Sequence, residues 1–470
     1  MSEESELDLS EWEQASGKKI VSFSFGWILM FFLGGQFNIY VFYYYNVEIG
    51  MPVVLLGLAF VIFAIWNAIN DPLIGYLTDK PFKWTRKWGM RFPWILIGGV
   101  PLLICWWFTF AVPDSIVESS DPWPLFWYFV LITCAFDTFY TIYTTHLGSS
   151  FTTHFVTDAD RRRASAVNVT LPNVLALVIG LIIPIFYVYG NRASMIFAMT
   201  IVVILLFCAL IILIPGIRES DELKERFLKG YEEQPKRDPY FKLMKDAFGR
   251  KSFAATLICF MLLTFGSTLS AASNVYFMKD VLGLPFAFAV YTGIAYFVGM
   301  ICSIPLWSNM SRKYGHAKTM KLSFLLMVFS YLPGLWITTI EEAVFFSVLG
   351  GAVAGCFWVT LGPVVADVYD ECTISTGKHQ EATYEAFRAL FNRLAFAFVG
   401  IVIPIIQIIT AYNTAPDAVQ TPTAIIGLRI QRSLIPSLLA LLAFIVMHRM
   451  YDLIGDKQVA VKKQLQEMGL

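Results

Sequence analysis

Long apolar stretches alternate with short polar ones along almost the whole chain. Twelve of these stretches reach the length of about 20 mainly apolar residues that a helix needs to cross a bilayer. They lie near residues 20–46, 52–79, 93–113, 123–151, 164–189, 194–216, 252–279, 284–309, 318–340, 343–369, 380–410 and 425–450. The pattern therefore predicts an all-α membrane protein with twelve transmembrane helices.

The longest polar break divides six predicted spans from six. We predict an N-terminal six-helix half at 1–217, a cytoplasmic linker at 218–251, a C-terminal six-helix half at 252–450 and a cytoplasmic tail at 451–470. A weak repeat supports this division. Residues 72–80 of the second span and 305–313 of the eighth both begin with Pro-Leu, carry Thr or Ser six residues later and end with Lys. Two halves of this kind place a substrate site near the membrane midplane.

Composition agrees with a membrane protein. The chain is 57% hydrophobic and only 15% charged, whereas soluble domains carry about 25% charged residues. The net charge of +0 carries little information, because the positions of the charges matter more, and no nucleic-acid partner is predicted. The seven cysteines lie mostly inside apolar stretches, so we expect neither disulfides nor a metal motif. Residues 1–16 are acidic and polar, which excludes a cleaved signal peptide.

The positions of the basic residues predict the orientation. Cytoplasmic loops are enriched in Lys and Arg, and an even number of spans puts both termini on one side. Cytoplasmic termini leave only four of the 35 Lys and Arg residues outside: Arg192, Lys279, Arg429 and Arg432. We therefore predict a multi-pass protein of the cell membrane, expected to be a monomer, with both termini in the cytoplasm.

Residues 66–80 place a carboxylate inside the second span. A charged side chain at the bilayer centre costs about 2.5–3.5 kcal/mol on insertion scales, so it normally faces a cavity and has a function. Asn67 and Asn70 lie one turn before Asp71 and share its side of the helix. Two amide oxygens and a carboxylate form a plausible site for a small cation or a proton. The alternative is a polar contact between packed helices.

A second carboxylate lies in the middle of the fourth span. Cys134 stands one turn before Asp137, and Tyr140 and Thr141 stand one turn after it. Two buried carboxylates close together do not both ionise freely, so one takes a proton or the pair takes a metal cation. We therefore predict that Asp137 lies near Asp71 and serves both cation and substrate, with a helix–helix hydrogen bond as the alternative.

Substrate candidates in the second half are fewer. Ser273 and Asn274 lie in the seventh span, where hydroxyl and amide groups also serve as ordinary packing contacts. Trp358 is in the middle of the tenth span, and its indole offers a flat face for a sugar ring and an N–H donor. It can equally be a packing residue.

Charges at the cytoplasmic helix ends predict an inner gate of ion pairs. Arg388 and Arg393 enter the eleventh span from that side and can pair with Asp367, Asp370 or Glu371 at the end of the tenth. Asp79, at the end of the second span, is included in the gate. Snorkelling of the arginines to the membrane surface is the alternative.

An enzyme is not expected. No metal-ligand spacing, nucleophile–base pairing or phosphate-binding loop occurs in the sequence. His146 and His154, near the end of the fourth span, are interpreted as surface residues rather than proton relays. No cofactor is predicted beyond a coupling ion.

Several motifs resemble one known family. The second-span motif WNAINDPLIG at 66–75 is accompanied by YYY at 43–45, RFPWIL at 91–96, ADVYDE at 366–371 with TGKHQEA at 376–382, and GLR at 427–429 with LIP at 434–436. In this order they resemble the glycoside–pentoside–hexuronide:cation symporters, the melibiose permease family of the major facilitator superfamily. The resemblance implies a major facilitator fold and transport of a sugar or glycoside with Na⁺, Li⁺ or H⁺.

The resemblance also assigns residues. Asp71 and Asp137 match the family's cation-site carboxylates, Cys134 its fourth-helix threonine, Trp358 an aromatic position of the sugar pocket and Asn392 its eleventh-helix lysine. Where the family has a further carboxylate four residues before Asp71, this chain has Asn67. Proton coupling is therefore favoured over a Na⁺ site at Asp71 and Asp137. The alternative function is transport of lysolipid or another amphipathic solute, since some relatives of the family move lysolipids.

Overall fold

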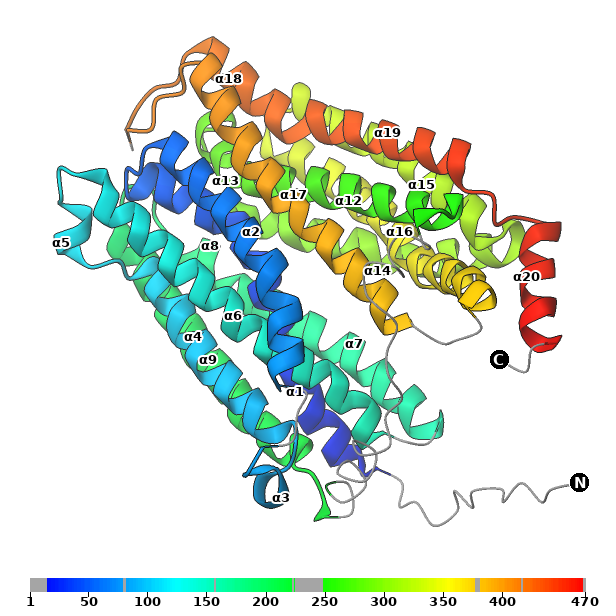
Figure 1. Cartoon of the computed structure of the whole chain (residues 1–470). Coiled ribbons are helices and arrows are strands. Elements are labelled where there is room, and N and C mark those ends of the chain that lie inside the picture. Colours follow the sequence, from blue (N-terminus) through cyan, green and yellow to red (C-terminus); the bar gives the residue numbers. More distant parts are fainter. Residues whose placement is uncertain are drawn as a thin grey trace, which may run out of the picture. The chain divides into compact units, whose positions relative to one another are not determined.

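The computed structural model describes residues 15–78, 82–155, 158–221, 224, 248–376, 381–415 and 417–467. These residues form helices and loops, and no strand occurs among them (Figure 1). Eleven of the described helices are long and apolar enough to cross a membrane. The all-α, multi-pass architecture predicted from the hydrophobic pattern is confirmed.

The ninth predicted span, 318–340, differs from expectation. Its α-helical part is α15 (His316–Tyr331), which has 16 residues and would rise only about 24 Å against a hydrocarbon core of about 30 Å. Pro333 and Gly334 follow in a 3-10 turn, η5 (Leu332–Leu335). Proline lacks the N–H that an α-helix needs, so the helix tightens where the apolar pattern continues. The count of twelve full-length helices is thus not reached among the described residues.

The chain forms two compact units. Unit 1 contains the described parts of Met1–Phe37, Trp66–Tyr187 and Arg192–Pro235, and unit 2 those of Asn38–Ile65, Val188–Asn191 and Lys236–Leu470. Helices α1 (Gly17–Tyr43) and α2 (Val53–Thr78) therefore contribute residues to both units. Most of the predicted linker, 218–251, lies outside the described residues, and the halves 1–217 and 252–450 remain a prediction.

Unit 1 is organised around α6 (Pro122–His154), which packs against α4 (Phe92–Phe110); α4 also packs against α9 (Arg192–Ile217), beside which it lies in Figure 1. The unit also contains α3 (Thr85–Trp88), α5 (Asp114–Val117), α7 (Asp158–Gly180) and α8 (Ile182–Phe186). At one end the Glu219 carboxylate accepts hydrogen bonds from the backbone N–H groups of Met90, Arg91 and Phe92. Glu219 thus satisfies the free N–H groups at the start of α4.

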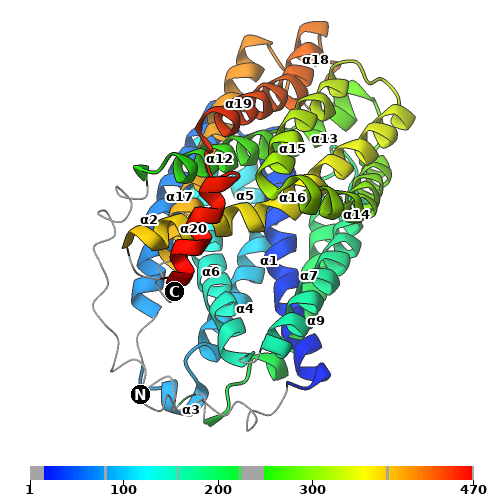
Figure 2. The ribbon, with the colours of Figure 1, turned by 90° about the vertical axis from the view of Figure 1, so that its right-hand side faces the viewer.

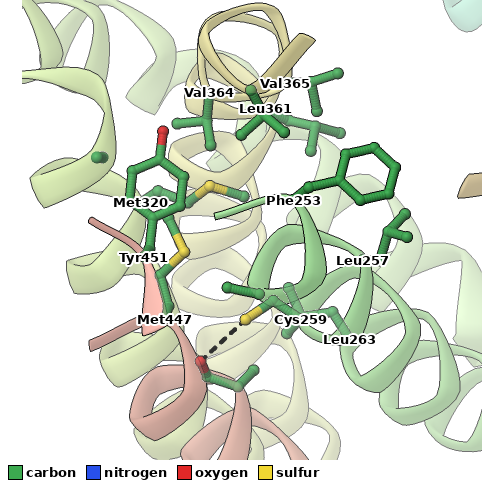
Figure 3. Packing of buried hydrophobic residues seen from close by; sticks show 14 of the residues in the cluster. Phe253, Leu257, Cys259, Leu263, Met320, Leu361, Val364, Val365, Met447 and Tyr451 are labelled. Atoms are coloured by element: carbon green, nitrogen blue, oxygen red, sulfur yellow. Dashed lines mark hydrogen bonds between the residues drawn. The ribbon is translucent and has the colours of Figure 1, made fainter. Parts of the chain in front are cut away.

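Unit 2 has a large apolar core to which five helices contribute. Figure 3 shows Phe253, Leu263, Leu361 and Met447 packed together, with the Cys259 thiol donating to the Ala443 carbonyl oxygen at 3.2 Å. The helices of this unit are α12 (Lys251–Ala272), α13 (Asn274–Tyr276), α14 (Ala289–Tyr314), α15, α16 (Ile340–Thr376), α17 (Glu381–Ile409), α18 (Pro422–Arg429), α19 (Ile435–Met450) and α20 (Asp456–Glu467).

Helices α14 and α16 approach each other closely because small residues line their contact. A Cβ atom added to Gly351 on α16 would lie 1.8 Å from the carbonyl oxygen of Tyr296 on α14. Only glycine fits at this distance, and small residues are the usual device for bringing membrane helices together.

Two helix ends in unit 2 have the same backbone conformation. The π-helical turns η2 (Tyr44–Glu48) and η3 (Phe277–Val281) are each followed by a glycine with positive φ, Gly50 and Gly283, and then by a proline two residues on. Matching hydrogen bonds close them, from Met51 N–H to the Tyr45 oxygen at 2.8 Å and from Leu284 N–H to the Met278 oxygen at 3.0 Å. The first and seventh spans therefore end in copies of one structural element.

Candidate functional site

The polar residues predicted in the second and fourth spans lie together in unit 1. Asn67 on α2 donates to Asp137 Oδ1 on α6 at 2.5 Å, and Asn70 donates to Asp137 Oδ2 at 3.2 Å. Thr141 donates to Asp71 Oδ1 at 2.6 Å and lies 3.4 Å from Asn70 Nδ2. A continuous hydrogen-bonded chain thus runs from one carboxylate to the other.

Helix periodicity explains why these groups meet. Asn67, Asn70 and Asp71 are spaced i, i+3 and i+4 on α2, and Asp137 and Thr141 are spaced i and i+4 on α6, so each set forms one short stripe. The two stripes face each other. Asn67, Asn70, Asp137 and Thr141 are at most 4% exposed, and Asp71 is half-buried.

The donors that the structure describes in this cluster are neutral. Asp137 receives amide N–H groups and Asp71 a hydroxyl group, and hydrogen bonds to a charged acceptor contribute about 1.5–3 kcal/mol each. They orient the carboxylates without cancelling their charge. The amide oxygen of Asn67 is buried and has no hydrogen-bond partner among the described residues. It is a candidate oxygen ligand beside the two acids.

Tyr140 and Cys134 flank the cluster. The Tyr140 hydroxyl donates to the Met30 carbonyl oxygen on α1 at 3.2 Å, and its ring stacks on Phe136. Cys134 is half-buried, and its carbonyl oxygen accepts from Thr138, whose hydroxyl also receives the Trp66 indole N–H. These contacts tie the cluster to α1 and α2.

The candidates on the seventh span have structural partners within unit 2. Ser273 donates to the Leu269 carbonyl oxygen at 2.6 Å and accepts from Gln431 at 2.7 Å. Asn274 Oδ1 accepts from Arg432 at 3.3 Å. Trp358 on α16 is 61% exposed and touches the Phe357 ring. An aromatic face is thus open at Trp358, whereas Ser273 is already hydrogen-bonded.

The predicted gate residues have contacts that the sequence did not indicate. Asp367 accepts from Gln458 at 2.6 Å and pairs with Lys462 at 3.4 Å, and both partners lie on α20. Figure 2 shows α20, in red, crossing α16. The Arg388 guanidinium lies 4.7 Å from the centre of the Phe260 ring.

Asp370 is half-buried at the end of α16. Asp79 and the side chains of Asn392 and Arg393 lie outside the described residues. The inner gate therefore stays a prediction.

Comparison with known proteins identifies the family. Residues 22–454 match the family model for MFS/sugar transport proteins. The chain belongs to this family. A glucuronide carrier protein homologue of Escherichia coli is 22% identical over 439 residues, 92% of each chain. The crystal structure of the nucleoside transporter NupG has a TM-score of 0.58 at 15% identity and covers 92% of this chain and 100% of its own. The major facilitator fold is thereby confirmed.

A sodium-dependent lysophosphatidylcholine symporter 1-A of Danio rerio is 23% identical over 373 residues. The match covers 70% of this chain and 66% of the fish protein, just under two thirds of its length. The proteins that resemble this MFS/sugar transport protein are thus a carrier, a nucleoside transporter and a sodium-dependent symporter by name.

The interpretation of the two histidines as surface residues is wrong. His146 is 1% and His154 is 7% exposed. The His146 ring stacks on Trp94 of α4 at 5.7 Å, and His154 accepts or donates hydrogen bonds at Ser150 and Arg218. Position near a helix end was a poor guide, because α6 continues to His154 and this part of the helix is covered by Trp94 on α4 and by the Arg218 backbone. The neighbouring Tyr143 and Leu147, buried on the same stripe, are the signal that could have revealed this.

Proposed function

We propose that this protein is a cation-coupled symporter of a sugar or glycoside-like solute that works by alternating access. The hydrogen-bonded cluster of Asp71, Asp137, Asn67, Asn70 and Thr141 carries the proposal. The described donors to these acids are neutral, so any negative charge on the pair must be neutralised by a cation before the site can lose contact with water. Coupling follows, because the protein changes conformation readily only when the acids are loaded.

Either of two monovalent cations can load this cluster. A proton on one carboxylate removes one charge at no cost in coordination geometry. A sodium ion needs several oxygen ligands, and the carboxylates, the Thr141 hydroxyl and the unpartnered amide oxygen of Asn67 are the available set. Since Asn67 replaces a carboxylate of the resembling family, the set carries one charge fewer, and this favours the proton.

A sugar-like solute is supported by similarity and by side-chain chemistry. A glucuronide carrier homologue resembles this chain over almost its whole length. Asp137, Tyr140 and Thr141 on α6 and the exposed indole of Trp358 are of the types that bind sugar hydroxyls and sugar faces. Ser273, Asn274 and Asn392 are weaker candidates for the same role.

Uptake into proteoliposomes tests the coupling. Labelled sugars and glucuronides are offered under an inward pH gradient, an inward sodium gradient or neither. We expect accumulation above the external concentration with a gradient, and its loss in Asp71→Asn and Asp137→Asn. Asp114→Asn is the matched control, because Asp114 is an exposed acid paired with Arg192 outside the cluster. Undiminished uphill accumulation in both cluster variants would refute the assignment.

A lysolipid or other amphipathic solute is the second candidate. The similarity to the Danio rerio lysophosphatidylcholine symporter favours it. Competition separates the two: a lysolipid carrier is inhibited by lysophospholipids and not by sugars, whereas a sugar carrier shows the reverse. The cation experiment is unaffected by which solute is carried.

A further inference from the structure

Two arginines in the last span of unit 2 converge on one aromatic ring. The guanidinium carbon of Arg432 lies 4.2 Å from the centre of the Phe277 ring, and that of Arg429 lies 5.9 Å from it. Arg429 ends α18 and Arg432 lies in the π-helical turn η6 (Ile430–Leu434) that follows. Two positive charges are therefore held side by side against η3.

Neither arginine has an acidic partner among the residues that the structure describes. Arg429 Nη1 donates to the Gly334 carbonyl oxygen at 3.1 Å, and Arg432 Nη2 donates to Asn274 Oδ1 at 3.3 Å. Each guanidinium has five N–H donors, so most of them are unused. Arg432 Nε is buried and has no hydrogen-bond partner in the described part of the chain.

The groups next to the two arginines do not balance their positive charge either. Lys279 Nζ is buried without a hydrogen bond, and Asp280 Oδ1 lies 3.9 Å from it. Asp280 is occupied on its other side, where Tyr412 donates to Oδ2 at 2.7 Å. The Ser433 hydroxyl beside Arg432 is also buried without a partner. Among the described residues, the one ion-pair contact of Arg429, Arg432 and Lys279 is thus the 3.9 Å approach of Lys279 to Asp280.

From these contacts we propose that Arg429 and Arg432 form a binding site for a phosphate-type anion. Planar guanidinium groups bind phosphate through paired N–H donors, and they retain their charge when partly buried. A bound oxyanion would take up the free donors and separate the two like charges. Arg429 and Arg432 are both half-buried as residues, although Arg432 Nε itself is covered.

The position along the helix suits a lipid headgroup. The span runs from Pro422 to Met450, and at 1.5 Å per residue Arg429 lies about 11 Å and Arg432 about 15 Å from its start. The polar layer of a bilayer occupies roughly the outer 5–7 Å on each side. Long arginine side chains bridge the remaining distance. A dissolved phosphate-bearing solute offers the same chemistry, and the experiment distinguishes the two sources.

Thermal unfolding of the full chain in detergent tests the site. One arm adds potassium phosphate against potassium chloride of equal ionic strength. The other adds a short-chain phosphatidylglycerol against a diacylglycerol of the same chain length. We expect the unfolding temperature to rise with a phosphate-bearing probe. Response to lipid alone identifies a headgroup site, and response to both identifies a site open to dissolved anions.

Variants assign the effect to the arginines. Arg429→Gln and Arg432→Gln should each raise the half-saturating concentration about tenfold or more, since each removes at least one charge-assisted hydrogen bond. Arg432→Lys keeps the charge without the planar fork and should fall between them and the wild type; it serves also if Arg432→Gln does not fold. Lys313→Gln is the matched control, because Lys313 is an exposed cation that lies over Tyr314. No stabilisation by either probe, or an unchanged response in the glutamine variants, would overturn the proposal.

Discussion

Replacing Asn67 by Asp should convert the α2–α6 cluster into a stronger sodium site. Asn67 Nδ2 now lies 2.5 Å from Asp137 Oδ1. An aspartate there would exchange this hydrogen bond for a contact between two carboxylates. Two unit charges about 4 Å apart repel by about 4 kcal/mol at an effective dielectric constant of about 20. The variant should therefore unfold at a lower temperature without sodium and need a cation to relieve the repulsion.

The assay is a sodium titration of the unfolding temperature at pH 8, where protons compete least. A repulsion of about 4 kcal/mol corresponds to at most about a thousandfold gain in cation affinity, and we expect at least a tenfold fall in the half-saturating sodium concentration. Asn413→Asp, at an exposed loop position, is the control and should change nothing. If Asn67→Asp has the stability of the wild type without sodium and the same half-saturation, the described contact between α2 and α6 is wrong.

Three further predictions concern unit 2. Gly351→Ala should destabilise the protein by more than about 3 kcal/mol, because the new Cβ would lie 1.8 Å from the Tyr296 oxygen; Gly293→Ala, with nothing within 4 Å, should be neutral or slightly stabilising in the same melt. Tyr276→Phe removes the 2.8 Å hydrogen bond to the buried Asn46 Oδ1 and should cost about 1–3 kcal/mol; equal stability of Tyr276→Phe and the exposed control Tyr291→Phe would contradict it. Docking of α20 should depend on pH. Burial opposes the charge on both Lys457 and Asp452. The hydrogen bonds of Lys457 with Asp452 and Glu371 outweigh this effect and raise the pKa of Lys457. The hydrogen bonds of Asp452 with Lys457 and Ser252 likewise outweigh it and lower the pKa of Asp452. The Lys457 contribution is full below the ordinary lysine pKa and is lost as the pH rises through the raised one. The Asp452 contribution is full above the ordinary aspartate pKa and is lost as the pH falls through the lowered one. The hydrogen-exchange protection factor across residues 456–467, the intrinsic rate divided by the observed rate, should thus be high from about pH 5 to 9 and fall outside that range. Lys457→Gln should abolish the protection and Lys463→Gln should not; protection that persists at both pH extremes would argue against these ion pairs.

Sequence patterns were informative for features that depend on one helix alone, namely its length and which of its residues share a face. The length of apolar stretches predicted nearly every membrane helix, because hydrocarbon thickness imposes that length directly. The i, i+3, i+4 spacing placed Asn67, Asn70 and Asp71 on one side of α2. Proximity of Asp137 to them was a hypothesis from burial cost, and the contacts Asn67–Asp137 and Asn70–Asp137 agree with it.

Contacts between distant segments were not predictable in the same way. The pairing of Asp367 with Lys462 on α20 depends on how a tail helix folds back, which no local spacing encodes. The burial of His146 depends on which side of α6 meets α4. The short length of α15 could have been predicted only by giving the local effect of Pro333 more weight than the uninterrupted apolar pattern around it.

The repeated turn at η2 and η3 has a geometric consequence. Tyr43 and Tyr276 hold equivalent positions, each directly before its turn, and their rings meet at 4.8 Å. In an arrangement with twofold symmetry, a position touches its own counterpart only beside the rotation axis, so this aromatic pair marks where such an axis would pass. The chemistry around it is not symmetric: the Tyr276 hydroxyl bonds to Asn46, and the residue equivalent to Asn46 in the other copy is Lys279. The two turns therefore share one backbone geometry but differ in charge at this position, neutral at Asn46 and cationic at Lys279.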